Sequence, residues 1–109
     1  AGAKRIEVDE LEKLLAGKPP RPVVFDANPE EIYREGHVPG AKWIAFDHVT
    51  ADALPADKDT MLVFYCYNEM CGASPAAAKA AIALGWRNVY LMGAGISGWK
   101  KANKAVERS

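Results

Sequence analysis

Four short apolar runs alternate with segments of helical pattern, and this alternation constrains the fold more than any other feature of the chain. The runs cover residues 23–25, 43–46, 61–65 and 88–92. Each run is too short for a typical helix, and β-branched and aromatic residues are frequent in them. Strands without polar alternation are typical of a parallel sheet that is covered on both faces. The sequence therefore predicts an α/β domain in which helices flank a mostly parallel sheet.

The segments between these runs predict helices. Residues 6–16 should form an amphipathic helix, because Val8, Leu11, Leu14 and Leu15 share one face and a glycine follows. The best-bounded helix should cover residues 75–84, with Ser74 as its N-cap and proline at its first position. Shorter helical segments are expected at 29–36, capped by Asn28, around 49–54, and at 96–106.

Length and charge restrict the classes of function. The 109 residues fit one domain, 1–109, which can bury a core without metal or disulfide support. Lys+Arg and Asp+Glu are both 14, so the balanced charge speaks against a nucleic-acid partner. No apolar run approaches the roughly 20 residues of a membrane span. We expect a monomer or weak homodimer in the cytoplasm, or in the periplasm if a signal peptide has been removed.

Cys66 is the candidate catalytic residue. It ends the apolar run 61–65 and stands one loop before the helix that is expected at 75–84. Unpaired amides and the helix dipole favour an anion at such a place, and they lower the pKa of a thiol there. The attacking form of cysteine is the thiolate, so the pattern indicates a nucleophile in a cradle of backbone amides. A small buried hydrophobic residue remains the alternative on this pattern alone.

The cysteines and histidines do not indicate a metal site. Cys66 and Cys71 are five residues apart, and two such ligands do not make a zinc site or a strong structural staple. His37 and His48 lack ligand-like spacing to them. The sequence predicts neither a metal nor a cofactor.

The order of several motifs resembles the rhodanese homology domain, the sulfurtransferase family. The resemblance covers about residues 6–105. The segments that carry it are Val-Phe-Asp at 24–26, Glu31 and Tyr33 before Gly-His-Val-Pro-Gly-Ala at 36–41, Val-Phe-Tyr-Cys at 63–66, Leu-Gly at 84–85, and 89–96 with Trp99.

This resemblance implies a three-layer sandwich with a mostly parallel five-stranded sheet and helices on both faces. It also implies that Cys66 takes sulfane sulfur from a donor, carries it as a persulfide, and passes it to a thiol- or cyanide-type acceptor. Asp26, at the same sheet edge, is a candidate support for the loop or a cap of its own turn. The expected substrate-binding loop consists of Tyr67, Asn68, Glu69, Met70, Cys71, Gly72, Ala73 and Ser74.

The loop departs from the family pattern. It is longer than usual, it has no cation, and Asn28 stands where the family often has arginine. Glu69 would repel an anion by on the order of 1 kcal/mol if it faced the pocket. We therefore expect a neutral or protein-bound persulfide donor rather than thiosulfate. Phosphatases of the cell-cycle type share the fold with a larger loop, but this loop lacks their phosphate-binding arginine.

Two further functions stay open beside sulfur transfer. If Cys71 reaches Cys66, the pair could act as a persulfide relay or redox couple, with Cys71 as the resolving cysteine. A catalytically weak binding or regulatory module is the other alternative, because the loop has no cation. His37 is expected to be structural, and Tyr67 is the aromatic residue expected at the pocket mouth.

Overall fold

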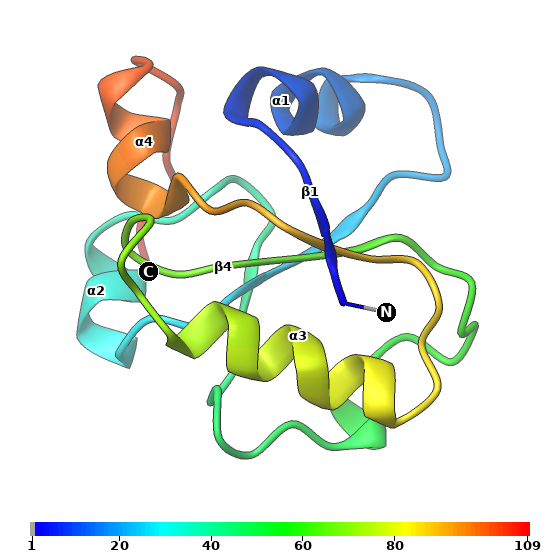
Figure 1. The fold of residues 1–109 in the computed structure, drawn as a ribbon. Helices are drawn as coiled ribbons and strands as arrows, with labels where there is room; N and C mark the ends of the chain where they lie inside the picture. Colours follow the sequence, from blue (N-terminus) through cyan, green and yellow to red (C-terminus); the bar gives the residue numbers. More distant parts are fainter. Residues whose placement is uncertain (1) are drawn as a thin grey trace.

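The computed structural model describes residues 2–109 and contains one five-stranded sheet (Figure 1). The strands lie in the order β1-β5-β4-β2-β3 and all neighbouring pairs are parallel. This confirms the predicted α/β class. The strands are β1 (Lys4–Arg5), β2 (Val23–Asp26), β3 (Lys42–Trp43), β4 (Leu62–Tyr65) and β5 (Val89–Leu91).

Alternate residues of the central strands face two separate cores. Phe25, Leu62 and Phe64 pack with the alanines of α3 (Ala73–Ala83) on one face. Val63 and Tyr65 pack on the other face with Leu11 of α1 (Val8–Ala16) and with α4 (Gly95–Lys101). Figure 1 shows α3 on one side of the sheet and α1 and α4 on the other. The remaining helical elements are α2 (Glu30–Glu35) and the 3-10 turn η1 (Ala51–Ala53).

Several predicted element boundaries are wrong. The strand β1 was not predicted, because its two residues are charged and exposed. The first helix begins at Val8 rather than at residue 6. The predicted strand 43–46 shrinks to Lys42–Trp43. The last helix ends at Lys101 rather than near 106, since Asn103 adopts a left-handed conformation with φ +60°. The chain then returns to pair with His37 through Glu107.

Two helix starts also differ from the sequence prediction. The first helical residue of α3 is Ala73, so Ser74 lies inside the first turn and Gly72 is the N-cap. Pro29 is the N-cap of α2 rather than its first residue. Within residues 2–109, no helix combines the length and the apolar character needed to cross a bilayer.

Candidate active site

The loop 66–72 leaves the carboxyl end of β4 and rests on the start of α4. The backbone N–H of Ile96 donates to the Cys66 carbonyl at 2.9 Å, and that of Ser97 donates to the Tyr67 carbonyl at 2.9 Å. These bonds satisfy amides that the first turn of a helix leaves without intrahelical partners. The start of the loop is therefore anchored to α4 through its main chain.

A glycine makes this close packing possible. Gly95 has φ +64°, and a Cβ atom there would lie 2.5 Å from the carbonyl carbon and oxygen of Tyr67. Any larger residue would push the loop away while also adopting an unfavourable backbone conformation. The Gly-Ala-Gly motif at 93–95 thus allows the loop to pack closely against the start of α4.

The two cysteines form a disulfide across the loop. Cys66 and Cys71 are bonded, with their Cα atoms 6.3 Å apart. Cys66 is buried with 1 % of its surface exposed, whereas Cys71 is partly exposed. The geometric condition for the relay hypothesis, that Cys71 can reach Cys66, is therefore met in this structure.

The sulfur of Cys66 lies at the N-terminus of α3. The Ser74 backbone N–H donates to Cys66 Sγ at 3.4 Å, and Ser74 Oγ lies 3.1 Å from the same sulfur. In the disulfide form, two other loop amides have different partners: those of Met70 and Cys71 donate to the side chain and the carbonyl of Asn68. The predicted cradle therefore consists here of one amide and one hydroxyl, both from Ser74.

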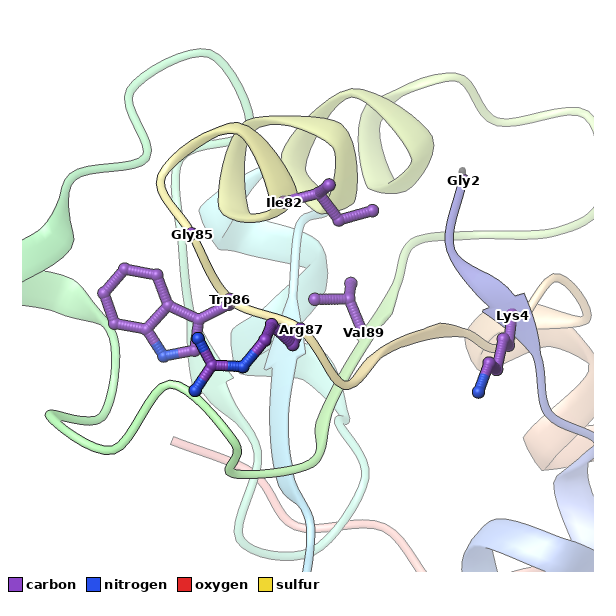
Figure 2. A pocket seen from close by; sticks show the side chains of 7 residues that line it. All are labelled: Gly2, Lys4, Ile82, Gly85, Trp86, Arg87 and Val89. Atoms are coloured by element: carbon purple, nitrogen blue, oxygen red, sulfur yellow. The ribbon is translucent and has the colours of Figure 1, made fainter.

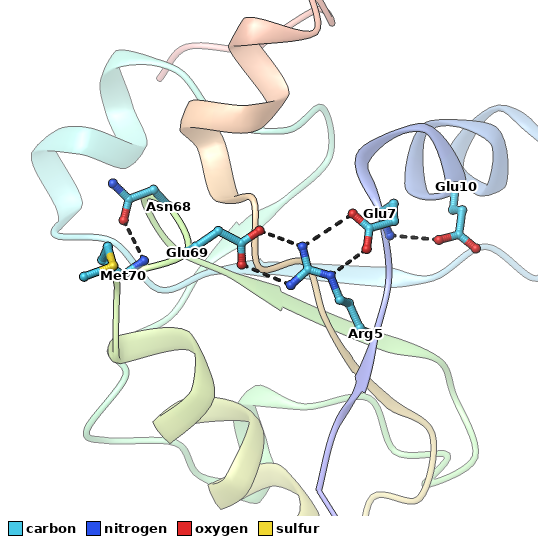
Figure 3. Close-up of polar contacts among 6 residues, drawn as sticks. All are labelled: Arg5, Glu7, Glu10, Asn68, Glu69 and Met70. Atoms are coloured by element: carbon cyan, nitrogen blue, oxygen red, sulfur yellow. Dashed lines mark hydrogen bonds and ion pairs between the residues drawn. The ribbon is translucent and has the colours of Figure 1, made fainter.

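A cation reaches the loop from outside it. Arg5, in β1, donates to both carboxylate oxygens of Glu69 at 3.0 and 2.6 Å, and it also binds Glu7 (Figure 3). The hydrogen bond from Arg5 lowers the pKa of Glu69. The negative charge of Glu69 is thus balanced at the surface, which the sequence did not indicate because the two residues are 64 positions apart.

Asp26 supports the strand end and its own turn. One carboxylate oxygen accepts bonds at 2.8 Å from the backbone and side-chain amides of Asn28. The other accepts a 2.7 Å bond from the Tyr65 hydroxyl, which itself accepts from the Val38 N–H. Burial raises the pKa of Asp26 despite these bonds. Its carboxylate therefore caps the turn, which agrees with one of the two predicted roles, and in this form it accepts no hydrogen bond from the loop 66–72.

His37 makes the contacts of a structural residue. Its ring stacks on Tyr33 with 3.9 Å between centroids, and Nδ1 lies 2.8 Å from the Tyr33 carbonyl. The side chain is buried and its backbone pairs with Glu107. These contacts agree with the predicted structural role.

An apolar pocket of about 360 Å³ lies beside Cys71. Its aromatic lining residues are Trp43 and Phe46, which are 38 % and 45 % exposed. Tyr67 is half exposed and does not line this pocket. Its place at the mouth of the Cys66 site stays a prediction. The pocket is lined by Ala27, Asn28, Pro29, Trp43, Ala45, Phe46, Asp47, Cys71 and Ala73.

A second pocket of about 370 Å³ lies at the opposite edge of the sheet (Figure 2). It is formed near the amino ends of β1 and β5 and the carboxyl end of α3, by residues that include Lys4, Ile82 and Val89. Because Cys66 follows the carboxyl end of β4, this pocket has no access to the disulfide.

Comparison with known families agrees with the fold and with the motif order. The rhodanese-like domain matches residues 7–102. The chain belongs to the rhodanese-like family. The resemblance inferred from the sequence is thereby confirmed.

Relatives of this rhodanese-like domain include an enzyme and several solved structures. Thiosulfate sulfurtransferase GlpE of Pseudoalteromonas translucida is 28 % identical over 87 residues, which are 79 % of this chain and 81 % of that protein. The BH2092 protein of Bacillus halodurans is 27 % identical, with a TM-score of 0.86 over 97 % of this chain and 77 % of that one. A rhodanese-like domain protein of Staphylococcus aureus is 26 % identical, with a TM-score of 0.76 over 97 % and 98 % of the two chains.

Proposed function

We propose that this protein is a sulfurtransferase in which Cys66 carries sulfane sulfur as a persulfide. The observation that carries the proposal is the position of Cys66 Sγ at the N-terminus of α3, within reach of both the amide and the hydroxyl of Ser74. Both groups can donate to a thiolate, and the helix dipole adds to their effect. Membership in the rhodanese-like family and the relation to GlpE support the same chemistry.

The reaction divides into two thiolate displacements. The Cys66 thiolate attacks the outer sulfur of a donor RSSH, forms the new S–S bond, and releases RS⁻. A thiol- or cyanide-type acceptor then attacks the outer sulfur of the Cys66 persulfide, and Cys66 leaves as a thiolate. A soft nucleophile with a stabilised anion suits both its attacking and its leaving role.

The disulfide favours a second candidate function, a relay that uses both cysteines. In this cycle the Cys71 thiolate attacks Sγ of the Cys66 persulfide, HS⁻ leaves, and the Cys66–Cys71 bond forms. Two equivalents of an external thiol RSH then reduce this bond to the dithiol and become RSSR. The relay therefore releases sulfide, whereas direct transfer passes the sulfur to the acceptor.

The surroundings of the disulfide favour a donor without negative charge. Arg5, which approaches the loop, is already bound to Glu69 and Glu7. Asp47 is among the residues that line the pocket beside Cys71, so its negative charge is near the disulfide. We therefore propose a neutral organic or protein persulfide as donor and expect slower turnover with thiosulfate.

Turnover with single-cysteine variants tests the proposal. Reduced protein is supplied with an uncharged alkyl persulfide, and product is measured with cyanide as acceptor and as free sulfide. We expect Cys66→Ser to abolish both products and Cys71→Ser to keep transfer to cyanide. Loss of sulfide release alone in Cys71→Ser supports the relay, and full transfer activity in Cys66→Ser refutes the proposed carrier. Absence of transfer with every donor would leave only a binding module.

A further inference from the structure

We propose that the pocket beside Cys71 binds an uncharged apolar thiol or persulfide, which opens the disulfide by attack on Cys71. This inference extends the proposed function, because the same step frees Cys66 as the sulfur carrier. It concerns two matters that the family relation leaves open: which sulfur is attacked, and which class of thiol attacks it.

Access favours attack on Cys71. Cys66 Sγ lies behind the loop in a residue that is 1 % exposed, whereas Cys71 is partly exposed and lines the open pocket. Displacement at a disulfide requires the thiolate to reach the sulfur that it attacks. A thiol bound between Trp43 and Phe46 would be adjacent to Cys71 and screened from Cys66.

The stability of Cys66 as a leaving group also favours attack on Cys71. Attack on Cys71 expels Cys66 as a thiolate at the N-terminus of α3, where the Ser74 N–H and hydroxyl can stabilise it. A thiolate that is better stabilised leaves faster. In the balanced step, RS⁻ forms an S–S bond to Cys71, the Cys66–Cys71 bond breaks, and its electron pair stays on Cys66.

The pocket walls favour an apolar, uncharged group on the attacking thiol. Alanine, proline and aromatic residues form most of the lining, and Asp47 is the charged residue among those described there. An anionic thiol would enter against that charge and gain no cation, whereas an aromatic ring would bury apolar surface on Trp43 and Phe46.

The test uses two thiols on the oxidised protein, without any sulfur donor. Benzyl mercaptan and mercaptoethanesulfonate are compared by the initial rate of disulfide opening, each rate being divided by that of the same thiol on oxidised glutathione. Early samples are quenched with iodoacetamide and mapped by mass spectrometry. We expect benzyl mercaptan to be faster by on the order of tenfold. The mixed disulfide should map to Cys71, and the group added by iodoacetamide should map to Cys66.

Matched variants separate the pocket from general effects. Phe46→Ser should remove most of the preference, whereas Leu14→Ser, which changes a similarly exposed apolar residue on α1, should keep it. Asp47→Lys should raise the rate of the anionic thiol about threefold. Equal normalised rates for the two thiols, an adduct on Cys66, or equal effects of the two serine variants would overturn the inference. Because no donor is present, such a failure is distinct from a failure of persulfide transfer.

Discussion

Replacing Ser74 by alanine should shift the reactivity of Cys66 in a way that a purely structural change cannot imitate. The hydroxyl lies 3.1 Å from Cys66 Sγ, while the backbone N–H at 3.4 Å remains in the variant. A hydrogen bond to a charged group contributes about 1.5–3 kcal/mol. Its loss would lower the thiolate population at a given pH about ten- to hundredfold, as long as the thiol is mostly protonated.

The change in rate should be smaller than the change in thiolate population. Intrinsic nucleophilicity rises as the thiolate becomes more basic, with a Brønsted coefficient of about 0.4–0.5, so about half of the effect is compensated. Below the titration range of the thiol, Ser74→Ala should therefore react about four- to fifteenfold more slowly. Above that range, where both proteins are ionised, the variant should react faster. The two pH–rate curves are thus expected to cross.

The assay is alkylation of Cys66 by iodoacetamide over a range of pH, in a Cys71→Ser background that leaves one cysteine. Ser97→Ala is the matched control, because Ser97 contacts the loop through its backbone N–H. The control should reproduce the parent curve. If the Ser74→Ala curve runs parallel to the parent without a shift along the pH axis, the hydroxyl does not stabilise the Cys66 anion and the reasoning is wrong.

Three further predictions concern the scaffold of the site. Burial raises the pKa of Asp26 in the folded state above its usual value of 3.8. The folded protein therefore binds this proton more tightly than the unfolded chain does, and the free energy of unfolding should fall as pH rises from 3.8 through the raised pKa. Asp26→Asn should remove this dependence in urea titrations at several pH values, and an unchanged slope of stability against pH would contradict the assignment. Tyr65→Phe should cost about 2–4 kcal/mol of unfolding free energy at neutral pH, because the Asp26 carboxylate and the Val38 N–H both lose the hydroxyl that they share. A loss below about 1 kcal/mol would show that the hydroxyl is dispensable. Gly95→Ala should cost about 2–4 kcal/mol, because its Cβ would collide with the Tyr67 carbonyl at a positive φ. Gly72→Ala is the control, as a Cβ there meets nothing within 4 Å, and equal melting temperatures for the two glycine variants would refute the close packing.

The sequence predicted the central strands of the sheet. The runs that became β2 and β4 are apolar throughout because both faces of these strands are covered. The strand β1 escaped prediction since an edge strand of two charged residues has neither an apolar run nor an alternating pattern. Its pairing with β5 depends on hydrogen bonds of the backbone, which residue types do not record.

The position of the candidate site was predictable from the sequence, but its contacts were not. A cysteine at a strand end before a helix is visible in the sequence, and the structure places Cys66 there. The pairing of Arg5 with Glu69 joins residues 64 positions apart, and no local pattern encodes it. Trp43 and Phe46 were expected in a buried strand; because the strand ends at Trp43, both aromatic side chains instead line an open pocket.

The intact mass of the reduced protein after treatment with one equivalent of an uncharged alkyl persulfide tests the central claim most directly. The account predicts a gain of one sulfur atom that maps to Cys66, persists in Cys71→Ser, and disappears on addition of cyanide. An unchanged mass, or a sulfur atom carried on Cys71 alone, would contradict the claim that Cys66 at the start of α3 is the sulfur carrier.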